Sequence, residues 1–257
     1  MTTAYEDRDW QTALRALETM GLHLTAYKRP QLERRLGSFL EREGFPSLER
    51  MVSQLRVDSE LFLRLHTYLT IHVTEFFRDS SYWEHFRAII EESPRQRWRI
   101  WSAGCSWGAE AVTAGLILED LGRHFDVTAT DSDGVVLERA RHGRYSLGDM
   151  EKVPESYHSH FQQVGDVWEL MPFQFGRIRF QSHDVAREAP PGLFDIVICR
   201  NVIIYFQADA RHRVLRSLAS SLVSGGRLFL GATETFLEYR EMGFEVERPS
   251  IFRKLPT

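Results

Sequence analysis

The sequence predicts an α/β fold in which a doubly wound, mostly parallel sheet follows a small all-helical unit. Beyond about residue 97, short apolar segments alternate with helical patterns, which is typical of parallel strands joined by crossover helices. Before about residue 70, apolar residues recur at helical spacing only. A glycine-containing loop that follows the first strand, at Gly104, is typical of a nucleotide-type site. We expect domains at 1–70 and 71–257.

Four short amphipathic runs make up the N-terminal domain. Pro30 suits the first turn of the second run, and Ser47 is a candidate N-cap after the break at Gly44 and Pro46. The apolar positions that define the four runs are Leu14, Leu17, Met20 and Leu22, then Leu32, Leu36, Phe39 and Leu40, then Leu48, Met51, Val52 and Leu55, and finally Leu61, Leu63, Leu65 and Leu69.

The second run carries a basic face. Arg35 and Arg42 lie on the side away from the leucines, with Arg34 at its edge. Such a face is most often a solvated charged surface. The alternative interpretation is a docking surface for an acidic partner helix.

A linker of mixed character, residues 69–79, joins the two domains. In the simplest interpretation Phe76 and Phe77 are core aromatics, and Arg78 forms an ion pair with Glu75 or Asp79. The helix that follows is expected to end at Ser93-Pro94.

Residues 99–111, RIWSAGCSWGAEA, predict a buried strand, a loop and the start of a helix that runs to Leu121. Gly104 and Gly108 would let the backbone approach a ligand closely. The loop lacks the three-glycine pattern of dinucleotide sites, and Glu110 would repel a pyrophosphate. A cationic ligand fits better, and S-adenosylmethionine has an ammonium group that Glu110 could bind. A tight turn without a function is the alternative.

The second strand, 125–130, ends at Asp131 and precedes a helix at 133–142. A carboxylate at the end of the second strand suits the two hydroxyls of a ribose, and Asp131 fits this role. Asp131 or Asp133 could instead be the N-cap of the helix, which would leave the other carboxylate for the ribose.

The remaining elements continue the alternation. We expect strands at 177–180, 194–199 and 227–230, a helix at 208–222, a turn at Gly225-Gly226 and an antiparallel hairpin formed by 244–247 and 251–254. One segment interrupts the pattern, because Gly165-Asp166 lies between β-favouring residues as a two-residue turn would. A small β-insertion at about 157–180 is therefore predicted.

Composition narrows the class of protein. The 257 residues have a formal net charge of −4, which gives no general attraction to nucleic acid or membranes. Two cysteines cannot form a disulfide framework, and we see neither a signal peptide nor a transmembrane segment. We expect a cytoplasmic, soluble protein. The ten histidines show no spacing that indicates a metal site.

Six motifs occur along the chain, in the order YKRPQLERRL (27–36), TEFFRD (74–79), WSAGCSWGAEA (101–111), ATDSDGVVLERARHGRYS (129–146), CRNVIIYF (199–206) and GATE (231–234). Together they resemble the motifs of the CheR family, the chemoreceptor glutamate methyltransferases of bacterial chemotaxis. The resemblance extends over nearly the whole chain.

The resemblance implies a class I S-adenosylmethionine-dependent methyltransferase that yields S-adenosylhomocysteine, with no metal. By position, Arg78 and Tyr205 match active-site residues, and Arg34, Arg35 and Arg42 match a receptor-docking helix. The implied cofactor-binding residues are His72, Thr74, Arg78, Gly104, Glu110, Asp131, Asp184, Val185, Asn201 and Val202. His72 replaces the usual asparagine, and Trp107 is unusual in its loop.

The implied activity is methyl transfer to glutamate side chains on the cytoplasmic helical bundle of a chemoreceptor, by a protein that is expected to be a monomer. Because the loop at Trp107 departs from the family pattern, a non-catalytic or retargeted relative that binds the cofactor or a signalling partner is the alternative. An oxidoreductase with a nicotinamide cofactor would share the sheet and the ribose carboxylate, but the dinucleotide pattern is missing.

Overall fold

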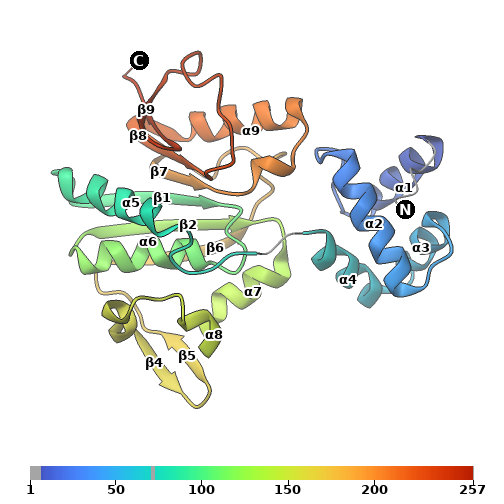
Figure 1. Cartoon of the computed structure of the whole chain (residues 1–257), viewed down its shortest axis with the longest axis horizontal. Helices are drawn as coiled ribbons and strands as arrows, with labels where there is room; N and C mark the ends of the chain where they lie inside the picture. The colour runs from blue at the N-terminus through green and yellow to red at the C-terminus, as the bar shows by residue number, and fades with distance from the viewer. Residues whose placement is uncertain (1–6, 71–72, 257) are drawn as a thin grey trace. The chain divides into compact units, whose positions relative to one another are not determined.

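The computed structural model describes residues 7–70 and 73–256 (Figure 1). By its internal contacts the chain divides into two compact units. The first contains the N-terminal helices and also the later segment Tyr205–Arg211, and the second contains the rest. The contribution of Tyr205–Arg211 to the first unit was not expected from the sequence.

The first unit is built from four helices, as the sequence predicts. They are α1 (Asp7–Thr19), α2 (Arg29–Glu43), α3 (Leu48–Leu55) and α4 (Ser59–Leu69). Pro30 lies in the first turn of α2, and the Ser47 side chain caps α3 by accepting the N–H of Arg50 at 3.2 Å. The apolar faces of the helices pack into one core, in which Leu17, Leu36 and Phe39 are fully buried.

The second unit is organised around a seven-stranded mixed sheet. Its strands are β1 (Arg97–Ala103), β2 (His124–Asp131), β6 (Gly176–Ser182), β7 (Phe194–Cys199), β8 (Leu222–Leu230), β9 (Phe244–Arg248) and β10 (Ile251–Lys254). The spatial order is β6-β2-β1-β7-β8-β10-β9, with parallel pairing up to β8 and antiparallel pairing of β10 with both neighbours. The order therefore reverses beside β1, where β2 and β7 lie on its two sides.

Helices cover one face of the β1, β2 and β6 part of this sheet. They are α5 (Ser80–Glu92), α6 (Ala109–Asp120) and α7 (Gly134–His142), and a further helix, α9 (Ala208–Ser220), follows β7 in the chain. In Figure 1, α5 and α6 lie in front of the strands. Every residue of α6 from Ala109 to Leu118 is buried, because the helix contacts α5 as well as β2 and β6.

The prediction of a turn at Gly225-Gly226 is wrong. Both glycines lie inside β8, which is longer than expected and runs from Leu222 to Leu230. Gly225 has a φ of +74°, and the pairing with β7 is irregular between Phe194 and Ile196. The glycines thus accommodate an irregularity within the strand, which a local pattern cannot distinguish from a turn.

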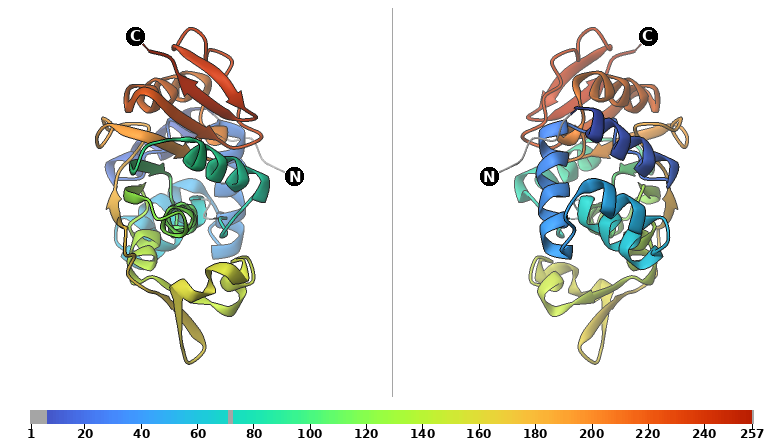
Figure 2. Two further views of the ribbon diagram at one scale, coloured as in Figure 1. Left: turned by 90° about the vertical axis from the view of Figure 1, so that its left-hand side faces the viewer. Right: turned by 90° about the vertical axis from the view of Figure 1, so that its right-hand side faces the viewer.

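A second, three-stranded sheet forms the predicted insertion. Its strands are β3 (Arg144–Ser146), β4 (Phe161–Val164) and β5 (Val167–Leu170), in the order β3-β5-β4. Val164 pairs with Val167 across the two-residue turn Gly165-Asp166, as the sequence predicts. Short helices, α8 (Leu147–Met150) and a 3₁₀ segment (Glu155–His160), precede β4. Both views of Figure 2 show the β4–β5 hairpin projecting from the large sheet.

The boundaries of the insertion differ from the predicted range of 157–180. The small sheet already begins at Arg144, and residues 176–180 belong to β6 of the large sheet. The pattern missed β3, because a strand of three residues is too short for an alternating pattern to be recognised.

Candidate cofactor site

The candidate site lies where β1, β2 and β7 end. The loop after β1 is fastened to the neighbouring strand, because the N–H groups of Gly104 and Cys105 both donate to the Thr130 carbonyl oxygen at 2.8 Å. The loops after β2 and β7 begin at the same edge, since the three strands are parallel neighbours. This is the position at which open α/β sheets bind nucleotides.

The two glycines of the loop after β1 are required by close contacts. Gly104 has a φ of +73°, and a Cβ atom there would lie 2.5 Å from Cγ2 of Val202. Gly108 has a φ of +89°, and its Cβ would lie 2.8 Å from the ring of Phe180. Because any side chain would push these neighbours away, the loop passes closely over the ends of the strands.

Asp131 and Asp133 have separate tasks. Asp133 is the N-cap of α7 and accepts the N–H of Val135 at 2.8 Å. Asp131 accepts the N–H of Ser106 at 2.8 Å and that of Asp133 at 3.0 Å. Of the two alternatives that the sequence left open, the structure therefore assigns the cap to Asp133. Asp131 remains at the strand end, beside the glycine loop.

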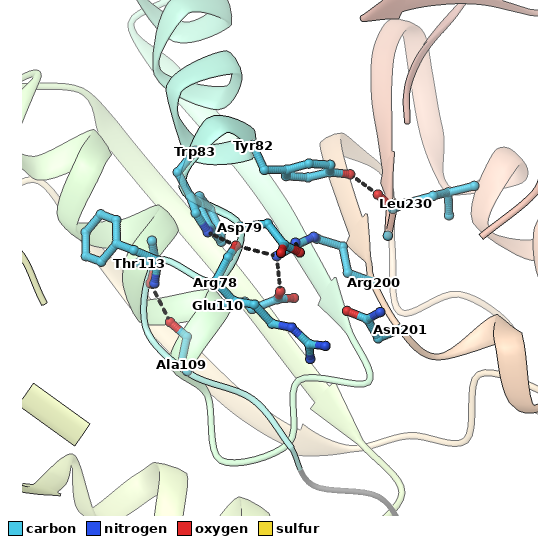
Figure 3. Close-up of polar contacts among 12 residues, drawn as sticks. Arg78, Asp79, Tyr82, Trp83, Ala109, Glu110, Thr113, Arg200, Asn201 and Leu230 are labelled. Atoms are coloured by element: carbon cyan, nitrogen blue, oxygen red, sulfur yellow. Dashed lines mark hydrogen bonds and ion pairs between the residues drawn. The ribbon is translucent and has the colours of Figure 1, made fainter. Parts of the chain in front are cut away.

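A buried ion pair between Glu110 and Arg200 lies at the centre of the site (Figure 3). The Arg200 side chain is fully buried, and it also pairs with Asp79 and donates to the Arg78 carbonyl oxygen at 3.2 Å. Its guanidinium carbon lies 4.2 Å from the centre of the Tyr82 ring. Arg200 thus connects the helix after β1 with the segment before α5.

Opposing influences act on Glu110. Burial raises the pKa of the Glu110 carboxyl group, whereas the positive charges of Arg200 and Arg78 lower it. The net shift is upward. Figure 3 shows the Arg78 side chain beside Glu110 of α6, with the Arg78 guanidinium group extending past the Glu110 carboxylate.

The segment around Arg78 adopts an unusual backbone conformation. Phe77 has a φ of +51° and Asp79 a φ of +57°, values that are rare for residues with side chains. The N–H of Phe77 donates to Thr113 Oγ1 at 3.2 Å, and Arg78 Nη1 donates to the Val73 carbonyl at 2.9 Å. Ser106 and Asn201, in the loops after β1 and β7, also have positive φ values. Backbone strain of this kind clusters at functional sites.

The simplest interpretation of the linker holds for its two aromatic residues but not for Arg78. Phe77 is partly buried and packs against the core, with its ring 5.0 Å from that of Tyr157. Phe76 is buried and contacts the rings of Trp107, Tyr145 and Phe161. The acidic neighbours that were expected to pair with Arg78 have other partners. Asp79 pairs with Arg200, and Glu75 lies 3.9 Å from Lys152.

Trp107, the unusual residue of the glycine loop, is part of the core. It is 5% exposed, its ring lies 5.4 Å from that of Phe76, and the guanidinium of Arg139 stacks on it at 4.4 Å. The departure from the family pattern at this position is therefore accommodated by packing.

Glu234 is a residue of the site for which the sequence indicated no role. Its carboxylate accepts four backbone N–H groups, from Asn201 at 3.0 Å, Val202 and Ile203 at 2.8 Å each, and Gly231 at 2.7 Å. Burial raises the pKa of Glu234, and these hydrogen bonds oppose the shift. The GATE motif was a signal for the residue, but three of its four partners lie 31 to 33 positions earlier in the chain.

The polar groups at this edge fit S-adenosylmethionine. Among the described residues, the buried atoms Ser106 Oγ and Asn201 Oδ1 have no hydrogen-bond partner. Such atoms are usually satisfied in the functional state. Together with the carboxylates of Glu110 and Asp131, they provide acceptors suited to an ammonium group and to ribose hydroxyls.

Other predicted residues lie near this edge or outside the described chain. Thr74 is half-buried in the extended segment before Phe76, and His72 lies outside the described residues. Asp184 follows β6 and accepts the N–H of Ala186 at 2.9 Å, while Val185 is buried. Asp184 thus stabilises its own turn.

The remaining predicted residues belong to the first unit. The carbonyl oxygen of Tyr205 accepts the N–H of Lys28 at 2.9 Å. On α2, Arg34 is exposed, whereas Arg35 donates to the Tyr68 carbonyl and its guanidinium lies 5.1 Å from the Tyr68 ring centre. Arg42 is 48% exposed and also stacks on Tyr68, at 4.6 Å. The basic face of α2 is therefore formed mainly by Arg34 and Arg42.

Two further findings concern the part of the chain that the structure describes. In residues 7–70 and 73–256, no cluster of three or more His, Cys, Asp or Glu side chains is placed to hold a metal ion. Within the same ranges, none of the helices has the length and apolar character needed to cross a membrane.

Comparison with known proteins gives consistent matches over most of the chain. Residues 72–250 match the profile described as "CheR methyltransferase, SAM binding domain", and residues 14–70 match "CheR methyltransferase, all-alpha domain". A chemotaxis protein methyltransferase of Listeria monocytogenes is 34% identical over 232 residues, which cover 87% of this chain and 88% of that protein. Chemotaxis protein methyltransferase 1 of Pseudomonas aeruginosa is 30% identical over 235 residues, covering 84% and 86%.

Proposed function

Since this chain belongs to the CheR family of S-adenosylmethionine-dependent methyltransferases of chemotaxis, we propose that it methylates glutamate side chains on the cytoplasmic helices of a chemoreceptor. The observation that carries the proposal is the cluster at the sheet edge. Arg78, Glu110 and Asp131 come from three separate segments, which are the stretch before α5, the first turn of α6 and the end of β2. Figure 3 shows Arg78 beside Glu110, and Asp131 accepts the N–H of Ser106 in the glycine loop at 2.8 Å.

The proposed cofactor contacts follow from the chemistry of this cluster. Glu110 would bind the ammonium group and Asp131 the ribose hydroxyls, with Asn201 and Val202 along the cofactor. Gly104 would allow the cofactor to approach the backbone of the loop closely. The other cofactor-binding residues that the family resemblance implies are His72, Thr74, Asp184 and Val185. When bound, S-adenosylmethionine supplies a methyl group that is activated by its sulfonium.

The substrate carboxylate needs little activation. A glutamate side chain has an ordinary pKa of about 4.3 and is ionised near neutral pH, so no general base has to remove a proton. The enzyme must instead hold the carboxylate in line with the methyl group and exclude water. We assign the orientation to Arg78, with the Tyr205 hydroxyl as a second donor. A strong ion pair between Arg78 and the substrate carboxylate would stabilise the reactant as much as the transition state and would not raise the rate. We therefore assign Arg78 a positioning role.

Docking of the receptor is assigned to α2. The cytoplasmic helices of chemoreceptors are rich in glutamate, which suits a basic helix face. Arg34 and Arg42 are the accessible cations of this face, and Arg35 supports it through its contacts with Tyr68.

The proposal is tested with purified protein, labelled S-adenosylmethionine and a receptor cytoplasmic fragment. The expected product is a base-labile methyl ester on glutamate. Arg78→Ala should lower methyl transfer about 100-fold while changing S-adenosylhomocysteine affinity little, because a misplaced reactant loses rate rather than cofactor binding. Arg253→Ala, which removes an exposed arginine of β10, is the control and should retain full activity.

Two outcomes would contradict these assignments. Equal losses of methyl transfer and S-adenosylhomocysteine affinity in Arg78→Ala would make Arg78 a cofactor ligand only. A wild-type protein that binds the cofactor but forms no methyl ester on any receptor fragment would favour a retargeted or non-catalytic relative.

A further inference from the structure

The β6, β2 and β1 half of the large sheet has two unlike faces. On one face, Ile178 and Phe180 of β6 point toward the helices, because they lie close to Gly115 and Gly108. Side chains alternate along a strand, so Arg177 and Arg179 lie on the opposite face. The chain passes from β6 to β7 through residues 183–193 without forming a helix. That opposite face therefore lacks the covering helix that a doubly wound fold usually places after such a strand.

Four arginines gather on this opposite face. Arg99 of β1, Asp126 of β2 and Arg177 of β6 lie side by side in register. Arg97 lies two residues before Arg99 on β1, and Arg179 lies two residues after Arg177 on β6, so both point to the same face. We call Arg97, Arg99, Arg177 and Arg179 the arginine face, and their side chains are 70%, 50%, 66% and 51% exposed.

Two carboxylates, one partly buried and one buried, hold these side chains in place from beneath. Asp126, whose side chain is only 15% exposed, lies 2.9 Å from Arg97, 2.7 Å from Arg177 and 3.8 Å from Arg179. Asp195 is 4% exposed and lies 3.8 Å from Arg99, but its nearer partner is Arg95 at 3.0 Å. The negative charges thus lie at the level of the sheet and the positive ones reach solvent. The array is ordered before any ligand arrives, which reduces the entropy cost of binding.

We propose that the arginine face binds an acidic helix of a partner protein. Two strands flank β2, so their arginines stand about 10 Å apart, and alternate residues of one strand are about 7 Å apart. Carboxylates two turns apart on a helix are separated by about 11 Å, and those one turn apart by about 5–6 Å. A helix that lies across the strands with glutamates at these positions would meet several guanidinium groups at once.

Other polyanions fit this face less well. Single-stranded nucleic acids need exposed aromatic side chains for base stacking, but Trp101, the aromatic residue that continues this row on β1, is fully buried. Thr128, its neighbour on β2, is also buried. In β1, β2 and β6, all of which the structure describes, no large apolar side chain is exposed that could enter a membrane. The proposal does not depend on glutamate methylation, because no residue of the arginine face belongs to the candidate cofactor site.

The test uses the full chain and a fluorescent helical peptide of about 20 residues with glutamates one and two turns apart on one side. An otherwise identical peptide with glutamine is the uncharged probe. Binding is measured by anisotropy at low and high salt. The double variant Arg97→Gln, Arg177→Gln is compared with Arg64→Gln, Arg253→Gln, which removes two ion-paired arginines elsewhere whose side chains are 49% and 47% exposed. Circular dichroism and S-adenosylhomocysteine affinity check that each variant is folded.

We expect salt-sensitive binding of the glutamate peptide, with little binding of the glutamine peptide. The affinity for the glutamate peptide should fall about fivefold in Arg97→Gln, Arg177→Gln, because two exposed ion pairs are lost. It should change less than twofold in Arg64→Gln, Arg253→Gln. Equal effects of the two double variants would overturn the proposal, and so would binding that depends on Arg34 and Arg42 instead. Tighter binding of a single-stranded oligonucleotide or of anionic vesicles, lost in Arg97→Gln, Arg177→Gln, would also overturn it.

Discussion

The Glu234 carboxylate accepts the backbone N–H of Val202 at 2.8 Å, and in this way a residue that follows β8 fixes the loop that follows β7. The same carboxylate binds the N–H groups of Asn201 and Ile203. Val202 in turn occupies the space that the absent side chain of Gly104 leaves free. Glu234 therefore controls the position of a loop that contacts the glycine loop.

Replacement of Glu234 by glutamine should reveal this control. The amide NH₂ group would face backbone N–H donors, and each buried donor without a partner costs about 1–3 kcal/mol. We expect a lower free energy of unfolding and weaker S-adenosylhomocysteine binding, measured by denaturant titration and calorimetry. Glu245→Gln, at an exposed carboxylate of β9, is the control. Unchanged cofactor affinity in a destabilised Glu234→Gln protein would make the role purely structural.

The role of Asp131 can be separated from that of its neighbour. Asp131→Ala should weaken cofactor binding, because each lost hydrogen bond between a carboxylate and a ribose hydroxyl is worth about 1.5–3 kcal/mol. Asp133→Ala should instead cost about 1 kcal/mol of stability through the lost helix cap and leave cofactor affinity nearly unchanged. Calorimetric titration of both variants distinguishes these effects. Equal losses of affinity would mean that the loop conformation, and not ribose binding, explains the result.

Gly104 and Gly122 provide a matched pair for the glycine loop. Both have positive φ values, +73° and +61°, but only Gly104 has a neighbour within 4 Å of the missing Cβ. Alanine at either position should cost about 1–2 kcal/mol of backbone strain. Gly104→Ala should in addition displace Val202 and weaken cofactor binding. If the two variants lose affinity equally, the contact with Val202 has no part in the site.

Cofactor affinity should depend on pH through Glu110. Burial raises the pKa of Glu110, so the ionised form that binds an ammonium group is lost at a higher pH than for an exposed glutamate. We expect the S-adenosylmethionine affinity to fall as the pH is lowered from neutrality toward the ordinary glutamate pKa of about 4.3, with the fall beginning above that value. Calorimetry over this range should show the fall in the wild type and a weak, nearly constant affinity in Glu110→Gln. Because this variant removes a partner of buried Arg200, its folding must be checked by thermal unfolding. A pH dependence that persisted in Glu110→Gln would assign it to another group.

Charge reversal on α2 should affect the receptor and not the cofactor. Arg34→Glu combined with Arg42→Glu should raise the apparent KM for a receptor fragment at low salt, since exposed pairs contribute about 0.2–1 kcal/mol each and are screened by ions. Arg35→Gln should mainly destabilise the helical unit, because Arg35 donates to the Tyr68 carbonyl. The test is the apparent KM for the receptor fragment, measured from methylation kinetics at two ionic strengths. Unchanged kinetics in the double variant would show that this face is only solvated surface.

The secondary structure was largely predictable because its signals are local. Apolar spacing gave the four N-terminal helices, and Ser47 indicated where α3 begins because an N-cap acts within one turn. The Gly165-Asp166 turn was recognisable for the same reason. Gly225-Gly226 misled the prediction, because a glycine pair inside a strand has the same local preference as a turn.

The candidate site was predictable in part. Glycine spacing and strand ends indicated Gly104, Glu110 and Asp131, since parallel strands bring their carboxyl ends to one edge. The roles of Arg78 and Tyr205 came from the resemblance to a family, and no pattern of spacing in this chain would have suggested them.

What the sequence by itself determined was most of the helices and strands, the family and the sheet edge that we propose for the cofactor. The tertiary structure alone decided which charges meet. Arg200 and Glu110 are separated by 90 positions, and Glu234 and Asn201 by 33, so no local pattern relates them. The order β6-β2-β1-β7-β8 brings these residues together, because pairing in the sheet depends on the path of the whole chain. For the same reason, only the fold showed that the arginine face is left without a covering helix.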